Sequence, residues 1–331
     1  MAFKSSSLRI CGSLMSGFYR PPAGVLFPFG HIVSDVAPPH VRNLYAVPTI
    51  AKFRSDVDYL ARHFRPLQIA ELEVLPRKRH REQHSECTFI FSFDDGLREV
   101  YEVIVPILRD KGLPAIFFLN SATIDNKQLM WRHKVSLVIE QSKCQPGRIP
   151  PQVSGRPWAS LCAKLNALRF KDLDIIDEVA KFYGLDFNDY LCRAKPYLTA
   201  DQVLELSRAG FEFGAHSESH PYFDEISIAD QERQISTSVH FIRSLGIQCR
   251  YFSFPFDDRG VPASTFKFMA DLKLNLSFGA SEACIDPIPF SFQRFRLDGG
   301  NANISLRDIL KQLSAKSLVR RLSGTDAIHR N

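Results

Sequence analysis

The sequence predicts an α/β protein whose parallel strands alternate with helices and close into a barrel, and three observations carry this prediction. Runs of β-branched and aromatic residues alternate with amphipathic helical patterns from residue 88 onward. Polar motifs stand directly after several strand runs, where a (β/α) barrel keeps its active site. The chain of 331 residues, with 45% hydrophobic and 24% charged content, is long enough for one large barrel.

The alternation predicts the order of the elements. The expected strands cover residues 25–29, 88–93, 115–119, 211–215, 250–256, 274–279 and 292–297. The expected barrel helices cover residues 48–64, 97–111, 200–209, 230–245 and 263–272. The rhythm breaks at residues 124–197, where helical patterns predict an insertion at the active-site rim. We therefore expect a poorly structured extension (1–24), a barrel with this insertion (25–304), and a basic helix with a tail (305–331).

Composition narrows the class of protein and its compartment. The seven cysteines are scattered and form no C-x-x-C, which argues against a disulfide framework and against a cysteine-rich zinc site. The first twenty residues hold no apolar core of signal-peptide length, so we expect a cytoplasmic protein. The net charge of +6 hints at an anionic partner. We expect no nucleic-acid partner, a solvated loop at the charge run 77–84, and at most weak peripheral membrane contact through the basic last helix.

Two adjacent carboxylates follow one of the most apolar strand runs. Residues 88–93 read T-F-I-F-S-F, and Asp94, Asp95 and the turn residue Gly96 come next. Carboxylates at the mouth of a buried strand are costly unless a metal ion or a shared proton compensates them. A polar turn with a helix cap explains a bare D-D-G equally well. The pair alone therefore leaves both interpretations open.

Two histidines follow another expected strand, and they change this balance. His216 and His220 stand four residues apart in H-S-E-S-H-P, so they can turn toward one point. Neutral imidazoles and one carboxylate suit zinc or a similar divalent metal, with positions left open for water. A lone H-x-x-x-H arises by chance on protein surfaces. Its combination with D-D-G, each motif at a strand's C-terminal end, predicts a metal site.

These motifs together resemble the polysaccharide deacetylases of the chitooligosaccharide-deacetylase type, carbohydrate esterase family 4. Residues 92–96 (S-F-D-D-G) match the first motif of that family, and residues 216–220 (H-S-E-S-H) match the second. Residues 252–256 (F-S-F-P-F) resemble the third motif, with an aromatic residue in place of the usual arginine. The resemblance covers roughly residues 25–298 and implies a distorted, incomplete (β/α) barrel with a helical insertion.

The resemblance also implies a metal-dependent hydrolase that removes N-acetyl groups from a carbohydrate. Asp95, His216 and His220 would hold one divalent ion, for which zinc is the expectation. Asp94 would act as general base toward a water molecule. The backbone N–H of Phe256 would stabilise the oxyanion.

The proton donor for the leaving amine is harder to assign, because the late leucine-x-histidine motif of the family is missing. Beyond residue 240 the only histidine is His329, and a fraying tail is a poor place for an acid. His31 ends the first expected strand and is our candidate, although an ordinary loop histidine would explain it as well. Arg294 and Asp298 form a second candidate group. There Arg294 could hold Asp94 ionised or serve only as a structural ion-pair partner.

Three other functions stay open at this point. An O-acetyl esterase would use nearly the same chemistry. An inactive relative that binds a glycan or a partner protein would explain the missing histidine, although the complete D-D and H-x-x-x-H motifs argue against it. An iron oxygenase with two histidines and one carboxylate is disfavoured, because we expect its ligands on a jelly roll rather than among βα units.

Overall fold

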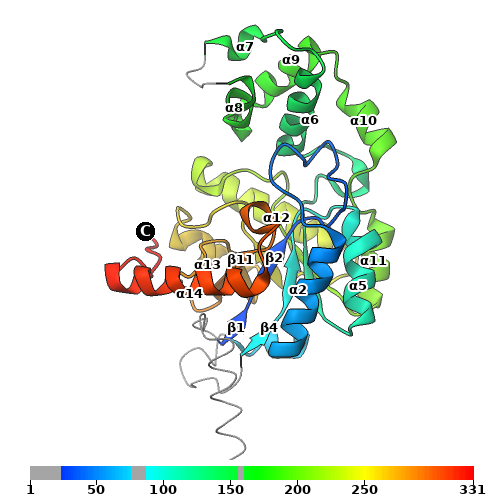
Figure 1. The fold of residues 1–331 in the computed structure, drawn as a ribbon. Coiled ribbons are helices and arrows are strands. Elements are labelled where there is room, and N and C mark those ends of the chain that lie inside the picture. The colour runs from blue at the N-terminus through cyan, green and yellow to red at the C-terminus, as the bar shows by residue number, and fades with distance from the viewer. Residues whose placement is uncertain (1–23, 76–86, 156–159) are drawn as a thin grey trace, which may run out of the picture.

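Parallel strands form the centre of the molecule, as the sequence predicts, and helices surround them (Figure 1). The computed structural model describes residues 24–75, 87–155 and 160–331. All neighbouring strands of the larger sheet are parallel. In spatial order they are β10 (Ser291–Gln293), β9 (Leu276–Gly279), β8 (Tyr251–Ser253), β7 (Glu212–Ala215), β6 (Ala115–Leu119), β5 (Phe91–Phe93), β2 (Pro28–Gly30) and β11 (Phe295–Arg296).

The two outer strands of this sheet belong to one segment of chain. Arg294 alone separates β10 from β11, so the segment pairs with β9 through its first half and with β2 through its second half. Phe292 lies opposite Phe278, whereas Phe295 lies opposite Pro28. The sheet therefore nearly closes on itself, which confirms the prediction of a distorted (β/α) barrel.

A small second sheet extends the barrel at the N-terminal ends of two strands. It contains β1 (Val25–Leu26), β4 (Thr88–Phe89) and β3 (Arg65–Pro66). Val25 pairs with Thr88 and Phe29 pairs with Ser92, so the residue numbers differ by 63 in both sheets. Each strand expected at 25–29 and 88–93 is therefore one extended segment with constant register. The segment 88–93 is divided into β4 and β5 because its partner on one side changes. β4 pairs there with β3, whereas β5 pairs with β6.

Alternating side chains fill the barrel interior. On β6, Ile116 and Phe118 belong to a different cluster from Phe117, which packs with the helices. The rings of Phe118 and Phe278 lie 5.5 Å apart, although β7 and β8 separate their strands in the sheet. Such a contact has to cross the interior, so the barrel is a packed core and not a pore.

Helices cover the outside of the barrel. The longer ones are α2 (Ile50–His63), α5 (Val105–Asp110), α11 (Ala200–Arg208), α12 (Ile228–Ser244), α13 (Ala263–Asp271) and α14 (Leu306–Ser323). Short helical turns are α3 (Ile69–Leu72), η1 (Val100–Ile104), η2 (Ile124–Asn126), η4 (Phe223–Glu225) and η5 (Gly299–Asn301). Thr49 caps α2 by accepting a hydrogen bond from the Lys52 N–H, as its sequence position predicts. No helix among the described residues is both long and apolar enough to span a membrane.

The helix expected at 97–111 begins later than predicted. Leu97 forms a β-bridge with Tyr197, and the backbone N–H of Arg98 donates to Pro196 O at 2.9 Å. These long-range bonds fix Leu97 and Arg98 to the segment at Tyr197, and the named helical structure starts with the π-helical turn η1 at Val100.

The helical insertion lies at one end of the barrel (Figure 1). It contains α6 (Trp131–Lys143), α7 (Pro151–Ser154), α8 (Leu161–Asn166), η3 (Phe170–Asp172), α9 (Leu173–Phe182) and α10 (Phe187–Ala194). Its apolar residues form a second core cluster that includes Trp131, Ile176 and Leu191. Since the insertion follows β6, it covers the C-terminal ends of the strands.

The C-terminal tail is docked and does not fray, which corrects the expectation from sequence. Ile285 forms a bridge with Ala327, and the Arg330 guanidinium contacts both Asp258 and Asp286. The three charged side chains are 2%, 0% and 0% exposed. Buried charges of opposite sign hold a segment in place because separating them leaves a charge without water. His329 itself is exposed, and the expected extension and charge run lie outside the described residues.

We predict that Arg330→Ala lowers the free energy of unfolding by about 3–5 kcal/mol, because two buried carboxylates lose their cation. Urea denaturation would measure the change. Arg321→Ala, which removes an exposed arginine of α14, should change stability by no more than about 0.5 kcal/mol. Equal effects of the two substitutions would contradict the prediction.

Candidate active site

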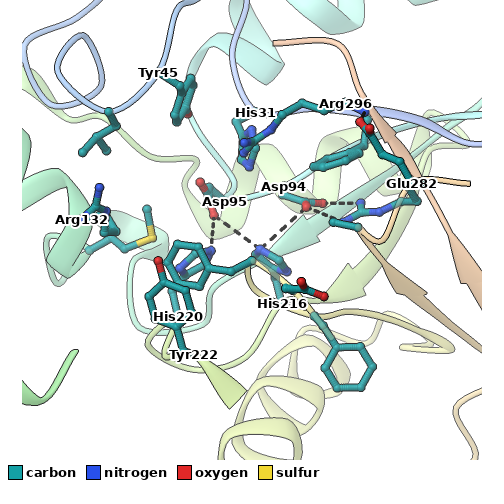
Figure 2. Close-up of a pocket in the computed structure, with 18 residues that line it drawn as sticks. His31, Tyr45, Asp94, Asp95, Arg132, His216, His220, Tyr222, Glu282 and Arg296 are labelled. Atoms are coloured by element: carbon teal, nitrogen blue, oxygen red, sulfur yellow. Dashed lines mark hydrogen bonds and ion pairs between the residues drawn. The ribbon is translucent and has the colours of Figure 1, made fainter. Parts of the chain in front are cut away.

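A cavity of about 450 Å³ lies at the C-terminal ends of the barrel strands (Figure 2). His31 follows β2, Asp94 and Asp95 follow β5, and His216 follows β7. Arg294 joins β10 to β11 and lines the same cavity. Parallel strands end at one face of a barrel, and this topology brings together side chains that are far apart in sequence.

Three of these residues form a cluster that could hold a metal ion. The ligand atoms of Asp95, His216 and His220 all lie within 4.8 Å of one another, and all three residues are buried. The Asp95 Oδ1 atom is 3.6 Å from His216 Nε2 and 3.3 Å from His220 Nε2. Figure 2 shows both imidazole rings facing the same carboxylate.

The hydrogen bonds around this triad leave its ligand atoms free. His216 Nδ1 lies 2.7 Å from the backbone carbonyl of Ser253, which can only accept, so Nδ1 carries the proton and Nε2 offers a lone pair. Burial lowers the pKa of His216 and, further, that of His220, so both rings are neutral. Asp95 Oδ1 is buried and accepts no hydrogen bond among the described residues. A bound cation would satisfy acceptor atoms that converge in this way, so the residues present fit a metal site.

The backbone at the site adopts a conformation that side-chain-bearing residues rarely use. The φ angles of Asp95, Ser217, His220 and Phe256 are 72°, 68°, 61° and 58°. Such positions cost on the order of 1–3 kcal/mol each and persist where the surroundings hold them. Ser217 Oγ accepts from the His220 N–H at 3.0 Å, and Trp131 Nε1 donates to the His220 carbonyl at 2.8 Å. The backbone of His220 is therefore held at both its N–H and its carbonyl group.

Asp94 is paired with Arg294 inside the barrel. The two guanidinium Nη atoms donate to the two carboxylate oxygens at 2.8 and 2.7 Å. Arg294 also donates to the hydroxyls of Ser92 and Ser253, at 3.1 and 2.6 Å. Burial by itself would raise the pKa of Asp94, but the adjacent guanidinium outweighs burial and holds this pKa well below its usual range. Asp94 is thus ionised and held in one orientation.

His31 and Asp298 form a second buried pair at the cavity. His31 Nδ1 lies 2.6 Å from Asp298 Oδ2, and the His31 backbone N–H donates to the same oxygen at 3.1 Å. Burial would lower the pKa of His31, but the Asp298 carboxylate overcomes this effect and raises it above the ordinary value. Burial would raise the pKa of Asp298, but His31 first and Arg296 second, whose Nε lies 2.9 Å from Asp298 Oδ1, hold it below the ordinary value. His31 therefore favours its protonated form.

An aromatic wall lies beside the triad. The ring of Phe256 stacks on Tyr222 with centroids 3.7 Å apart, and it meets the His220 ring edge-on at 4.5 Å. The ring centroid of Trp131, in the insertion, lies 6.0 Å from that of Phe256 and 6.1 Å from that of Tyr222. The sequence interpretation used only the backbone of Phe256, whereas its side chain also keeps water from one side of the site.

Sequence reasoning missed several residues at the cavity, among them three aromatic residues and one arginine. Tyr45 packs against His31, and its hydroxyl is buried without a partner among the described residues. Tyr222 and Arg132 also line the cavity, and Trp131 backs it through the aromatic wall. Only Tyr222 carried a local signal, because it stands two residues after His220. The other three come from segments whose position over the barrel follows from tertiary packing.

Comparison with known proteins agrees with this geometry. The family model for polysaccharide deacetylase matches residues 81–275, more than half of the chain. Similar solved structures include the Streptococcus pyogenes deacetylase PplD in complex with acetate, at 15% identity and a TM-score of 0.55, with 87% of this chain and 97% of that chain covered. They also include IcaB from Ammonifex degensii, at 15% identity and a TM-score of 0.53, with 89% and 97% covered.

A third similar structure is a de-N-acetylase from Aggregatibacter actinomycetemcomitans, at 16% identity and a TM-score of 0.52, with 82% of this chain and 94% of that chain covered. These similarities support the fold, and no curated protein matches the sequence. The match to the family model, together with the D-D and H-x-x-x-H residues in one cavity, shows that the chain belongs to the polysaccharide deacetylase family and is a carbohydrate deacetylase, a hydrolase.

Proposed function

We propose that this deacetylase removes N-acetyl groups from a carbohydrate with the help of one divalent metal ion. The observation that carries the proposal is that one cavity holds a ligand triad, a carboxylate paired with Arg294 and an imidazole bonded to Asp298. These are the groups that hydrolysis of an acetamide needs, because water must lose a proton and the amine must gain one.

Asp95, His216 and His220 would hold the ion. Two neutral imidazoles and one carboxylate are a ligand set that zinc prefers, so we propose zinc. When bound, the ion lowers the pKa of a water molecule and polarises a carbonyl group.

Asp94 is the proposed general base. Its Oδ2 atom lies 3.8 Å from His216 Nε2, so the carboxylate borders the ligand triad without belonging to it. Arg294 occupies both carboxylate oxygens and keeps the group in its proton-accepting form at neutral pH. Asp94 then takes a proton from the attacking water, and the backbone N–H of Phe256 is the proposed donor to the oxyanion.

His31 is the proposed general acid. Its bond to Asp298 favours the imidazolium, which can deliver a proton to the departing amine. An O-acetyl ester needs this proton less, because an alkoxide leaves more easily than an amide anion. The presence of a protonated acid in the cavity therefore supports N-deacetylation over the esterase alternative.

We predict that His216→Ala and His220→Ala abolish stoichiometric metal binding, because each removes one of three ligands. Elemental analysis of the purified variants would measure it. The control is His240→Ala, which removes an exposed histidine of α12 and should leave the metal content unchanged. Full metal content in both site variants would overturn the ligand assignment.

The two aspartates should respond differently to the same substitution. Asp94→Asn should keep the metal but reduce turnover about a hundredfold or more, because the base is lost. Asp95→Asn should lose metal and turnover together. Metal content and acetate release, measured on the same preparations, distinguish the two roles, and equal metal loss would remove the distinction.

His31→Ala should reduce cleavage of an N-acetyl substrate by about a hundredfold or more and affect an O-acetyl substrate much less. The wild-type rate on the amide should fall as pH rises past the raised pKa of His31, because the acid form is lost. The variant should not show that alkaline decline. Acetate release from both substrates across a pH series would test this, and a loss below about threefold on the amide excludes His31 as the acid.

A further inference from the structure

Almost every charged side chain that lines the catalytic cavity has a partner of opposite charge. Asp95 belongs to the metal-ligand triad, and the remaining pairs are Asp94 with Arg294, His31 and Arg296 with Asp298, Glu282 with Lys316, and Asp257 with Arg259. Arg132 is the exception in the part of the chain that the structure describes. It lines the cavity and forms no ion pair there.

The contacts of Arg132 among the described residues include no opposite charge. Its guanidinium lies 5.2 Å from the centroid of the Trp131 ring, which is a neutral partner. Its Nη1 donates to the Asn166 carbonyl at 3.0 Å, and its Nη2 donates to Asn166 Oδ1 at 3.3 Å. Both acceptors are neutral, and they use two of the five N–H donors of a guanidinium.

A second arginine lies nearby and increases the positive charge on this side of the cavity. Arg169 covers the Tyr222 ring with its guanidinium 4.6 Å from the ring centroid. Burial and the charge of Arg169 lower the pKa of Arg132, although not enough to deprotonate an arginine at neutral pH. Arg169 itself lies 3.6 Å from Glu225, so Arg132 remains the cation without an opposite charge.

A partly buried cation without a counter-charge costs free energy unless a ligand supplies the anion. We propose that Arg132 binds an anionic group, a carboxylate or a phosphate, that the carbohydrate substrate carries close to its acetylated sugar. This proposal rests on the proposed function, since it assigns a substrate class to the same cavity. Guanidinium groups suit both anions because their planar N–H donors can form paired charge-assisted hydrogen bonds.

The position of Arg132 explains how one substrate can contact this arginine and the ligand triad together. Figure 2 shows Arg132 on the side of His220 and Tyr222, across the cavity from Glu282 and Arg296. Arg132 is the second residue of α6, next to Trp131, whose Nε1 donates to the His220 carbonyl. The helical insertion therefore places a charge-recognising side chain beside the ligand triad and fixes it to the barrel through its neighbour.

Matched pairs of ligands test the proposal through binding, without turnover. The first pair is a hyaluronan tetrasaccharide, whose glucuronate residues alternate with N-acetylglucosamine, and its carboxyl-reduced neutral form. The second pair is N-acetylglucosamine 1-phosphate and N-acetylglucosamine. Isothermal titration calorimetry on the metal-loaded wild-type protein should show at least about tenfold tighter binding of the anionic member in one pair, and that pair identifies the anion.

Variants of Arg132 test whether this side chain causes the preference for the anionic ligand. Arg132→Gln should abolish the preference and leave affinity for the neutral ligand unchanged. Arg132→Lys should keep part of the preference, and it provides a second test if the first variant misfolds. The control Arg193→Gln removes an exposed arginine of the insertion and should keep the full preference. Equal affinity for anionic and neutral ligands in the wild-type protein, or a preference that survives in Arg132→Gln, overturns the proposal.

Acetate release from the neutral ligands separates this proposal from the proposed function. If the wild-type protein deacetylates a neutral sugar but shows no anion preference, the Arg132 assignment fails and the deacetylase mechanism stands. If it binds the anionic ligand selectively through Arg132 but releases no acetate from any N-acetyl ligand, the mechanism fails and the anion site stands.

Discussion

Arg294 lies where the last strand segment leaves β9 and joins β2, and both of its Nη atoms bind the Asp94 carboxylate at the end of β5. The two side chains are 1% and 2% exposed, so neither charge could be tolerated without the other. The ion pair thus ties the closing segment of the barrel to the strand that carries both aspartates of the D-D motif. Because the same guanidinium also binds Ser253, it connects the end of β8 to this point.

The two adjacent aspartates owe their different properties to this interaction. Asp94 has the Arg294 guanidinium beside it, and its pKa is lowered. Burial raises the pKa of Asp95, which has imidazoles beside it but no guanidinium bonded to it among the described residues. Neighbouring carboxylates with opposite shifts are typical of sites that divide two roles between similar groups. In the proposed mechanism the first carboxylate is ready to accept a proton, and the second awaits a metal cation.

The helical insertion contributes to the site from outside the barrel. Trp131 holds the peptide of His220, and Arg132 brings an uncompensated charge to the cavity. The barrel thus supplies the ligand triad and the Asp94–Arg294 pair, while the insertion supplies further contacts at the cavity. A substrate preference located on the insertion could change without disturbing the ligand triad, because loops and insertions vary more freely than barrel strands.

The sequence by itself determined the local features of this protein. Breaker-free apolar runs predicted the central strands, and residues 115–119 were predicted with the bounds that β6 has. Thr49 predicted the cap of α2. The D-D and H-x-x-x-H motifs predicted the metal-ligand triad, because strand ends of a parallel barrel meet at one face. Each strand, cap and motif depends on residues close together in the chain, where spacing and side-chain type carry the information, and the parallel topology brings the two motifs together.

Only the tertiary structure decided which distant groups are paired. His31 and Asp298 are 267 residues apart, and no local pattern reports their contact. Asp94 and Arg294 are 200 residues apart, and their pairing was one of two alternatives that the sequence left open. The docked tail, the late start of the helix after Gly96 and the uncompensated charge of Arg132 have the same origin. Charges and hydrogen bonds act over a few ångströms in space. The separation of two residues along the chain does not report their distance in space, which depends on the fold.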